Sequence, residues 1–128
     1  YYEAGELPWD VIIDDGSHLN EHQITTATHL LGRRRLAVGG TYIIEDIHSS
    51  CKGWIANVPN AAGHMVVDGT SGCMKTRRGA PTIFAQLVAW QTSLAAGNHG
   101  ALQSLGVNIG HVSIYREAAA IQVIGYLQ

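Results

Sequence analysis

The stretch that decides the fold is VIIDDGSH, residues 11–18, which places two carboxylates and an imidazole directly after a short β-branched run. A second stretch, YIIED at residues 42–46, repeats the order of an apolar run and an acidic pair. Such apolar runs are typical of buried strands in a parallel sheet. About 25 residues separate the two stretches, which is enough for a helical crossover. A right-handed β–α–β unit brings both strand ends to one sheet edge, where open α/β sheets bind ligands.

The carboxylates at this edge indicate a cation site. Asp14, Asp15, Glu45 and Asp46 would converge there with His18. Carboxylates this close repel one another unless a cation or a shared proton lies between them. An all-oxygen ligand set favours a hard divalent ion such as magnesium over zinc. Asp14 is left out of the predicted ligand set, because an aspartate at a strand end is more often a turn former.

The rest of the chain extends the β–α–β unit into a larger α/β sheet. Its final link is short enough to favour an antiparallel hairpin over a crossover. The irregular middle segment is typical of a functional or mobile loop. In chain order, the predicted elements are a strand (11–14), a helix (21–35), a strand (41–45), a long loop (47–80), a helix (81–96) and two hairpin strands (105–115 and 119–127).

Composition narrows the class of protein. The 128 residues fit one domain, and 46% hydrophobic against 14% charged residues excludes a disordered chain. A net charge of −2 argues against a nucleic-acid surface, and no apolar run reaches the length of a membrane span. Cys51 and Cys73 lack metal-site spacing, and no secretory signal is visible. We therefore predict reduced cysteines and a cytoplasmic protein.

Two motifs carry a family resemblance. DVIIDDGSH, residues 10–18, resembles the fourth-strand motif of metal-dependent, S-adenosylmethionine-dependent sugar O-methyltransferases, the mycinamicin-type and rhamnosyl enzymes of antibiotic biosynthesis. VGGTYIIEDIH, residues 38–48, is similar to their fifth-strand motif, and the spacing also fits. The resemblance is specific from about Asp10 to Trp54. It implies that residues 1–128 form the C-terminal portion of a Rossmann-like class I methyltransferase sheet, with parallel strands and a terminal antiparallel hairpin.

The resemblance also implies roles for individual residues. Carried over from the family motifs, Asp15, Glu45 and Asp46 would be the ligands of Mg²⁺ or Mn²⁺, and His18 would be the general base. S-adenosylmethionine would supply the methyl group to a hydroxyl of a sugar or another small natural product. The glycine-rich cofactor loop of the family has no counterpart in this chain, so no cofactor-binding residue is assigned. His48 is a secondary candidate for contact with the substrate.

Three interpretations stay open at this point. The first is a small-molecule O-methyltransferase, and the second is a non-catalytic methyltransferase-fold fragment or assembly module. The third, a metal-dependent hydrolase, is weaker because no nucleophile elbow is present. Without a strand on its outer side, the apolar strand at residues 11–13 would leave an open backbone edge. We therefore expect a homo-oligomer or a longer parent chain.

Overall fold

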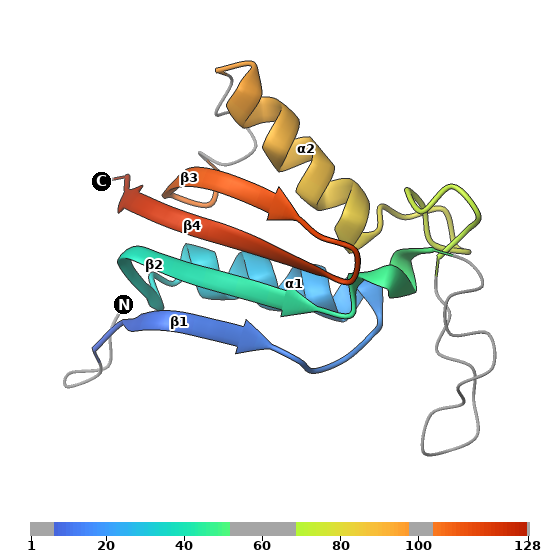
Figure 1. Cartoon of the computed structure of the whole chain (residues 1–128), viewed down its shortest axis with the longest axis horizontal. Helices are drawn as coiled ribbons and strands as arrows, with labels where there is room; N and C mark the ends of the chain where they lie inside the picture. The colour runs from blue at the N-terminus through green and yellow to red at the C-terminus, as the bar shows by residue number, and fades with distance from the viewer. Residues whose placement is uncertain (1–6, 52–68, 98–103, 128) are drawn as a thin grey trace.

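The computed structural model describes residues 7–51, 69–97 and 104–127. These residues form one four-stranded sheet with two helices packed against it (Figure 1). In chain order, the elements are β1 (Trp9–Asp14), α1 (Asn20–Gly32), β2 (Leu36–Glu45), the 3₁₀ helix η1 (Ile47–Ser50), α2 (Ile83–Ala95), β3 (Val107–Ile114) and β4 (Ala118–Tyr126). Neither helix in this part of the chain combines the length and apolar character needed to cross a bilayer.

The sheet has the strand order β1-β2-β4-β3. β1 and β2 are parallel and joined through α1, whereas β4 runs antiparallel to both β2 and β3. The predicted fold class is confirmed, with two parallel strands followed by an antiparallel hairpin that inserts its second strand beside β2. Because β1 and β2 are parallel, their carboxyl ends lie at one edge of the sheet.

Among the element boundaries that differ from the prediction, three have a local cause in the backbone or in a helix cap. β2 begins at Leu36 and not at residue 41, because residues 38–40, where a turn would be expected before the strand, form an irregularity within it, and Gly39 has a φ of 88°. α1 ends at Gly32, and Arg34 then adopts a left-handed φ of 56°. α2 begins at Ile83, because the Thr82 hydroxyl caps it by accepting a hydrogen bond from the Ala85 N–H.

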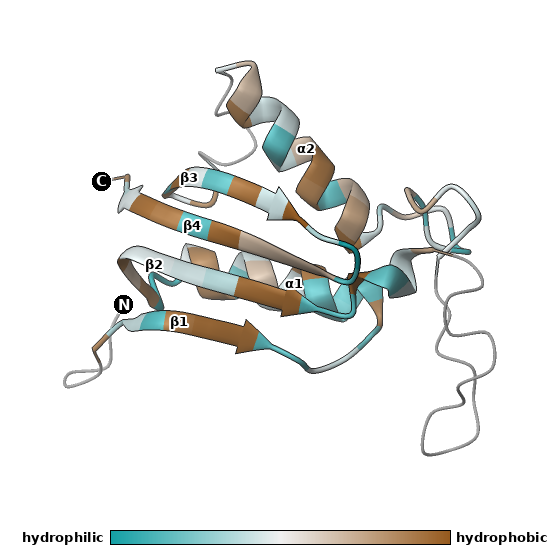
Figure 2. Cartoon of the chain, in the orientation of Figure 1, coloured by the Kyte–Doolittle hydropathy of each residue, from teal (hydrophilic) through white to brown (hydrophobic). Residues whose placement is uncertain are grey.

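The core lies between the sheet and the two helices. Alternate residues of β2 and β4, including Tyr42, Ile44 and Ile121, are fully buried against α1 and α2. The opposite face of the sheet is open among the described residues: Val11 is 52% and Ile13 is 58% exposed. The hydrophobic colour of β1 marks this edge in Figure 2. The predicted burial of the two apolar runs is therefore confirmed for Tyr42 and Ile44 of β2. It is wrong for Val11 and Ile13 of β1, because both helices cover the other face.

The prediction of reduced cysteines is also wrong in this structure. Cys51 and Cys73 form a disulfide. A parallel bridge pairs Cys51 with Thr70, and a turn then brings the Cys73 N–H to the Thr70 carbonyl. The folding of the loop thus brings the two cysteines together, although no motif in the sequence indicates that they pair. Residues 52–68 of the predicted long loop lie outside the described residues.

Candidate functional site

The predicted metal ligands lie at one edge of the sheet, where β1 and β2 end. Asp14 of β1 pairs with Ile44 of β2 in parallel register. One residue further along both chains, Asp15 and Glu45 follow at the same sheet edge, and both are exposed. Asp46 comes directly after β2. The parallel pairing of β1 and β2 therefore places the backbone of Asp15, Glu45 and Asp46 at the edge where the two strands end.

Asp46 lies between two imidazoles. Its Oδ2 is 3.0 Å from Nε2 of His18, and its Oδ1 is 3.8 Å from Nδ1 of His48. The two rings have centroids 6.4 Å apart and tilt by 58°. The side chains of His18 and Asp46 are each about one-third exposed, so the pair faces a surface that a ligand can reach. The structure thus brings the predicted base into contact with one predicted metal ligand.

The backbone at Asp46 aims this carboxylate. Asp46 has φ 57° and ψ 33°, a left-handed conformation that aspartate tolerates better than most residues. It stands just before η1, and the next N–H, of Ile47, donates to the Glu117 carbonyl in the β3–β4 turn. This turn directs the chain away from β2 and into η1. As a result, His48 comes back to the same carboxylate.

A buried polar junction, formed by Asn20, Ser50 and Gln23, holds the elements around the site together. Asn20 is fully buried at the start of α1, and its Oδ1 accepts hydrogen bonds from the Ser50 hydroxyl and the Ile83 N–H, each at 2.8 Å. Ser50 Oγ accepts in turn from the Phe84 N–H. Gln23, which is 3% exposed, donates from Nε2 to the Glu45 carbonyl. These contacts tie α1, η1 and α2 to the end of β2.

Sequence reasoning missed this junction. Asn20 is a candidate cap for α1 by its position, but Leu19 is the N-cap residue there and α1 has no side-chain cap. Asn20 instead satisfies the first N–H of α2, 63 residues away. A long-range cap of this kind has no local sequence signal, because the same residue type at a helix start normally caps its own helix.

Asp14 has a structural role. Its Oδ1 accepts from the Gly16 N–H at 3.2 Å, which confirms the predicted role in the turn. Its Oδ2 accepts from the hydroxyl of Tyr42 at 2.6 Å. Burial of Tyr42, and then the hydrogen bond and charge of Asp14, raise the pKa of that phenol well above its usual range. Both oxygens of Asp14 are therefore used in holding β1, β2 and the following turn together.

The fit of a metal ion depends on how these side chains are arranged. The three predicted ligands offer only carboxylate oxygens, which suits a hard divalent cation. Within the described ranges, however, no three side chains among His, Cys, Asp and Glu are gathered around a point where they could hold a metal. Asp46 engages the imidazoles instead, and one of its oxygens, Oδ1, has only a long contact with His48. The donor types fit the ion, and the side chains would have to close around it.

Curated relatives are sugar O-methyltransferases. Demethylmacrocin O-methyltransferase of Streptomyces fradiae is 43% identical over 56 residues, covering 44% of this chain and 12% of its own length. L-olivosyl-oleandolide 3-O-methyltransferase of Streptomyces antibioticus is 49% identical over 43 residues, covering 34% of this chain and 11% of its own length. The chain therefore spans only about a tenth of the curated relatives it matches. No protein-family model matches the chain.

Solved structures extend the similarity to nearly the whole chain. The MycE methyltransferase of the mycinamycin pathway, in complex with Mg, SAH and mycinamycin VI, matches 91% of this chain with a TM-score of 0.55 and 25% identity. A second MycE structure, with Mg and SAH, has a TM-score of 0.62 at 21% identity over 91% of this chain. The fold is that of a partial Rossmann-like methyltransferase. The chain covers 25% and 26% of the MycE chains in these two structures, and the resemblance to sugar O-methyltransferases is confirmed.

Proposed function

We propose that this chain forms the metal and acceptor side of an O-methyltransferase that methylates a hydroxyl of a sugar on a small natural product. The observation that carries the proposal is the contact of His18 with Asp46 at the edge where β1 and β2 end. Its support is the similarity of the chain to enzymes named for methylating macrolide and tetracenomycin sugars. The methyl donor is S-adenosylmethionine, because the similar MycE structures hold its demethylated product SAH beside Mg.

His18 serves as the general base in this proposal. A neutral imidazole carries one proton, and the carboxylate of Asp46 at 3.0 Å favours that proton on Nε2. The lone pair is then on Nδ1, which takes the proton of the acceptor hydroxyl. Histidine suits this task because its side chain ordinarily exchanges a proton near neutral pH. Asp46 fixes the ring orientation and stabilises the imidazolium that forms.

Asp15, Glu45 and Asp46 would hold the divalent cation. When bound, such an ion acidifies a coordinated hydroxyl and fixes the acceptor in place. Asp46 has two carboxylate oxygens, of which Oδ2 lies 3.0 Å from His18 Nε2 and Oδ1 makes only the longer contact of 3.8 Å with His48 Nδ1. The same aspartate thus links the base to the metal position. The remaining task of these residues is to position the hydroxyl for in-line attack on the sulfonium methyl group.

The alternative is a non-catalytic methyltransferase-fold fragment or assembly module. The open apolar face of β1, with Val11 and Ile13 more than half exposed, favours this alternative. A cytoplasmic location, predicted from the sequence, belongs to the enzymatic proposal.

Binding of Mn²⁺ to the chain tests the proposal, measured by electron paramagnetic resonance and by calorimetry. The matched variants are Asp46→Asn and Asp10→Asn, because Asp10 is an exposed aspartate near the other end of β1. We expect binding by the wild-type chain, loss of about tenfold or more in affinity for Asp46→Asn, and no change for Asp10→Asn. Equal binding in all three chains, or binding in none, would contradict the metal site and favour the assembly module.

A further inference from the structure

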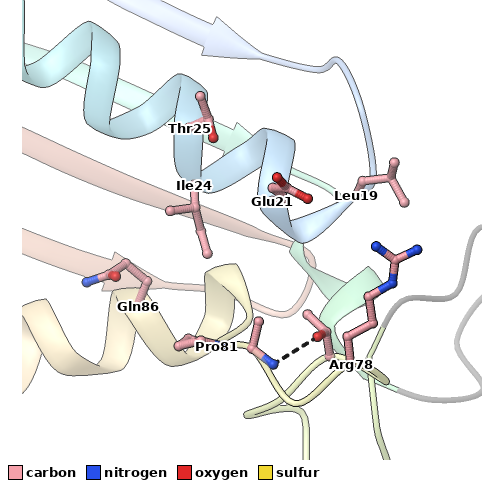
Figure 3. Close-up of a pocket in the computed structure, with 9 residues that line it drawn as sticks. Leu19, Glu21, Ile24, Thr25, Arg78, Pro81 and Gln86 are labelled. Atoms are coloured by element: carbon pink, nitrogen blue, oxygen red, sulfur yellow. Dashed lines mark hydrogen bonds between the residues drawn. The ribbon is translucent and has the colours of Figure 1, made fainter.

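A cleft lies between the first half of α1 and the segment that leads into α2 (Figure 3). Its volume is about 420 Å³, within the usual range of small-molecule sites. The residues that line it include none of the predicted metal ligands and neither imidazole of the candidate site. Its lining is mixed, because apolar residues alternate with polar and charged ones. The polar and charged residues of the lining are Glu21, Thr25, Thr76, Arg78 and Gln86.

The wall of the cleft opposite α1 is a turn that its own hydrogen bonds hold in place. The Thr76 N–H donates to the Ala80 carbonyl, and the Ala80 N–H donates back to Thr76 Oγ1. Beyond this turn, the start of α2 is tied to α1, because Asn20 Oδ1 accepts from the Ile83 N–H. A cleft held in this way is largely preformed, which lowers the entropic cost of binding a ligand.

Two opposite charges face the cleft from its two walls. Glu21 lies in the first turn of α1, and Arg78 lies in the turn between Thr76 and Ala80. Figure 3 shows the Arg78 side chain extending from the lower wall toward α1. The two groups do not pair with each other, and neither forms a hydrogen bond or an ion pair with another described residue. Both side chains are exposed, so each charge can be reached by a ligand.

The charges and the apolar residues together select a kind of ligand. A ligand that carries only a negative charge is attracted by Arg78 and repelled by Glu21, and a purely cationic ligand meets the reverse. A ligand that carries both charges is attracted by both walls. Leu19, Ile24 and Pro81 add apolar surface beside these charges, which suits an apolar group on the same ligand.

We propose that this cleft binds a free α-amino acid with an apolar side chain. Arg78 binds the carboxylate, Glu21 binds the ammonium group, and the side chain of the ligand packs against Leu19, Ile24 and Pro81. Such a ligand is neutral overall, so both of its charges and both charges of the cleft find a partner. The inference does not depend on the proposed function, because it uses neither the general base nor the metal ligands.

A titration followed by proton–nitrogen NMR correlation spectra tests the inference with three probes of different charge. L-leucine carries both charges, L-leucinamide lacks the carboxylate, and N-acetyl-L-leucine lacks the ammonium group. We expect L-leucine to shift resonances of residues 19–25 and 76–86, with a Kd of about 1 mM because both charged residues are exposed. Each derivative should bind about tenfold more weakly, because it loses one of the two charge contacts.

Two variants assign each charge of the ligand to one wall. Arg78→Gln should weaken L-leucine binding about tenfold and leave L-leucinamide binding unchanged, because the amide has no carboxylate to lose. Glu21→Gln should weaken L-leucine binding about tenfold and leave N-acetyl-L-leucine binding unchanged. The matched controls are Arg77→Gln and Glu117→Gln, which remove the same charges at exposed positions outside the lining and should change no affinity.

The outcomes separate this inference from the proposed function. Derivatives that bind as tightly as L-leucine overturn it, as do Arg78→Gln and Glu21→Gln variants that behave like their controls. An L-leucine titration that shifts no resonance of the cleft at up to about 10 mM also overturns it. None of these results depends on whether Mn²⁺ binds, since no probe or variant involves a predicted metal ligand. Circular dichroism of each variant confirms that α1 is intact.

Discussion

The two faces of the sheet differ although the same strands build both. On β4, Ile121 is fully buried beneath the helices, whereas Ile124 is 55% exposed on the other face. The residues on the two faces are equally β-branched and apolar. Residue type therefore shows that both faces suit burial, and only the placement of α1 and α2 decides which face is covered.

This difference explains where the chemistry lies. The covered face gains its stability from packing, and its buried polar junction holds the ends of β1 and β2 in register with η1. The open face offers apolar surface that the described residues leave uncovered, which is typical of an interaction surface. The candidate site lies at the edge of the sheet, between the two faces. The polar junction on the covered face holds it in place, and the open apolar face lies next to it.

The largest expected effect comes from truncating one isoleucine on each face of β4. Ile121→Ala should lower the free energy of unfolding by about 3 kcal/mol, because it removes a fully buried side chain and leaves a cavity. Ile124→Ala should cost less than about 1 kcal/mol, because Ile124 is 55% exposed. Urea unfolding of the two variants measures the difference. Similar costs would mean that the open face is buried in solution.

The next largest effect is expected at the buried polar junction. Asn20→Ala should lower the free energy of unfolding by about 2 kcal/mol, since it leaves the Ser50 hydroxyl and the Ile83 N–H without their acceptor in a dry environment. Asn108→Ala, at an exposed position of β3, is the matched control and should be nearly neutral. Chemical denaturation compares the two. A neutral Asn20→Ala would contradict the role of the junction.

A smaller effect with a distinctive pH dependence is expected at Tyr42. Because its pKa is raised in the folded chain, the folded state keeps the phenol proton at a pH where the unfolded chain has lost it. The resulting stability is fully present below about pH 10, the ordinary value for tyrosine, and decreases as the pH rises above it. Tyr42→Phe should cost about 1 kcal/mol at pH 8 and flatten the alkaline decline.

Urea unfolding at pH 8 and at pH 11 measures this dependence. Tyr115→Phe is the control, because Tyr115 is 63% exposed and should leave the alkaline decline as it is in the wild-type chain. An alkaline decline that persists unchanged in Tyr42→Phe would mean that other groups dominate this pH range.

The local parts of the fold could be predicted from the sequence. The β-branched runs before Asp14 and Glu45 predicted β1 and the end of β2. The short link before Ala118 predicted the hairpin of β3 and β4. These features depend on a few neighbouring residues. The start of β2 could not be predicted in this way. Gly39 and Gly40 are typical of a turn, yet they lie in an irregularity of β2 between the pairing of Leu36 with Trp9 and the pairing of Thr41 with Val11.

The candidate site was predictable in its residues and not in its contacts. The motifs point to His18 and Asp46, yet their contact depends on the left-handed backbone of Asp46 and on η1, which brings in His48. The disulfide between Cys51 and Cys73 depends likewise on how the loop folds. Contacts between residues far apart in sequence follow from tertiary packing, which local propensity does not encode.

The smallest effect on stability, and the sharpest test of the open face, is expected at the β1 edge. Among the described strands, β1 lies at the end of the sheet, and Trp9, Val11 and Ile13 are all more than half exposed. An apolar strand with unpaired backbone groups is prone to pair with another chain. Ile13→Lys should change the free energy of unfolding by no more than about 0.5 kcal/mol and should shift a self-associating chain toward monomer.

Sedimentation velocity over a range of concentrations measures this shift, with Ile124→Lys as the matched variant. Ile124 lies on the open face two strands away from β1, so its replacement leaves the β1 edge unchanged. Dissociation by Ile13→Lys alone indicates pairing along β1, whereas dissociation by both variants indicates that whole open faces stack. A wild-type chain that is monomeric at every concentration would contradict self-association. In that case the two faces would still differ in how they are packed, but the open face would not be an interface between copies of this chain.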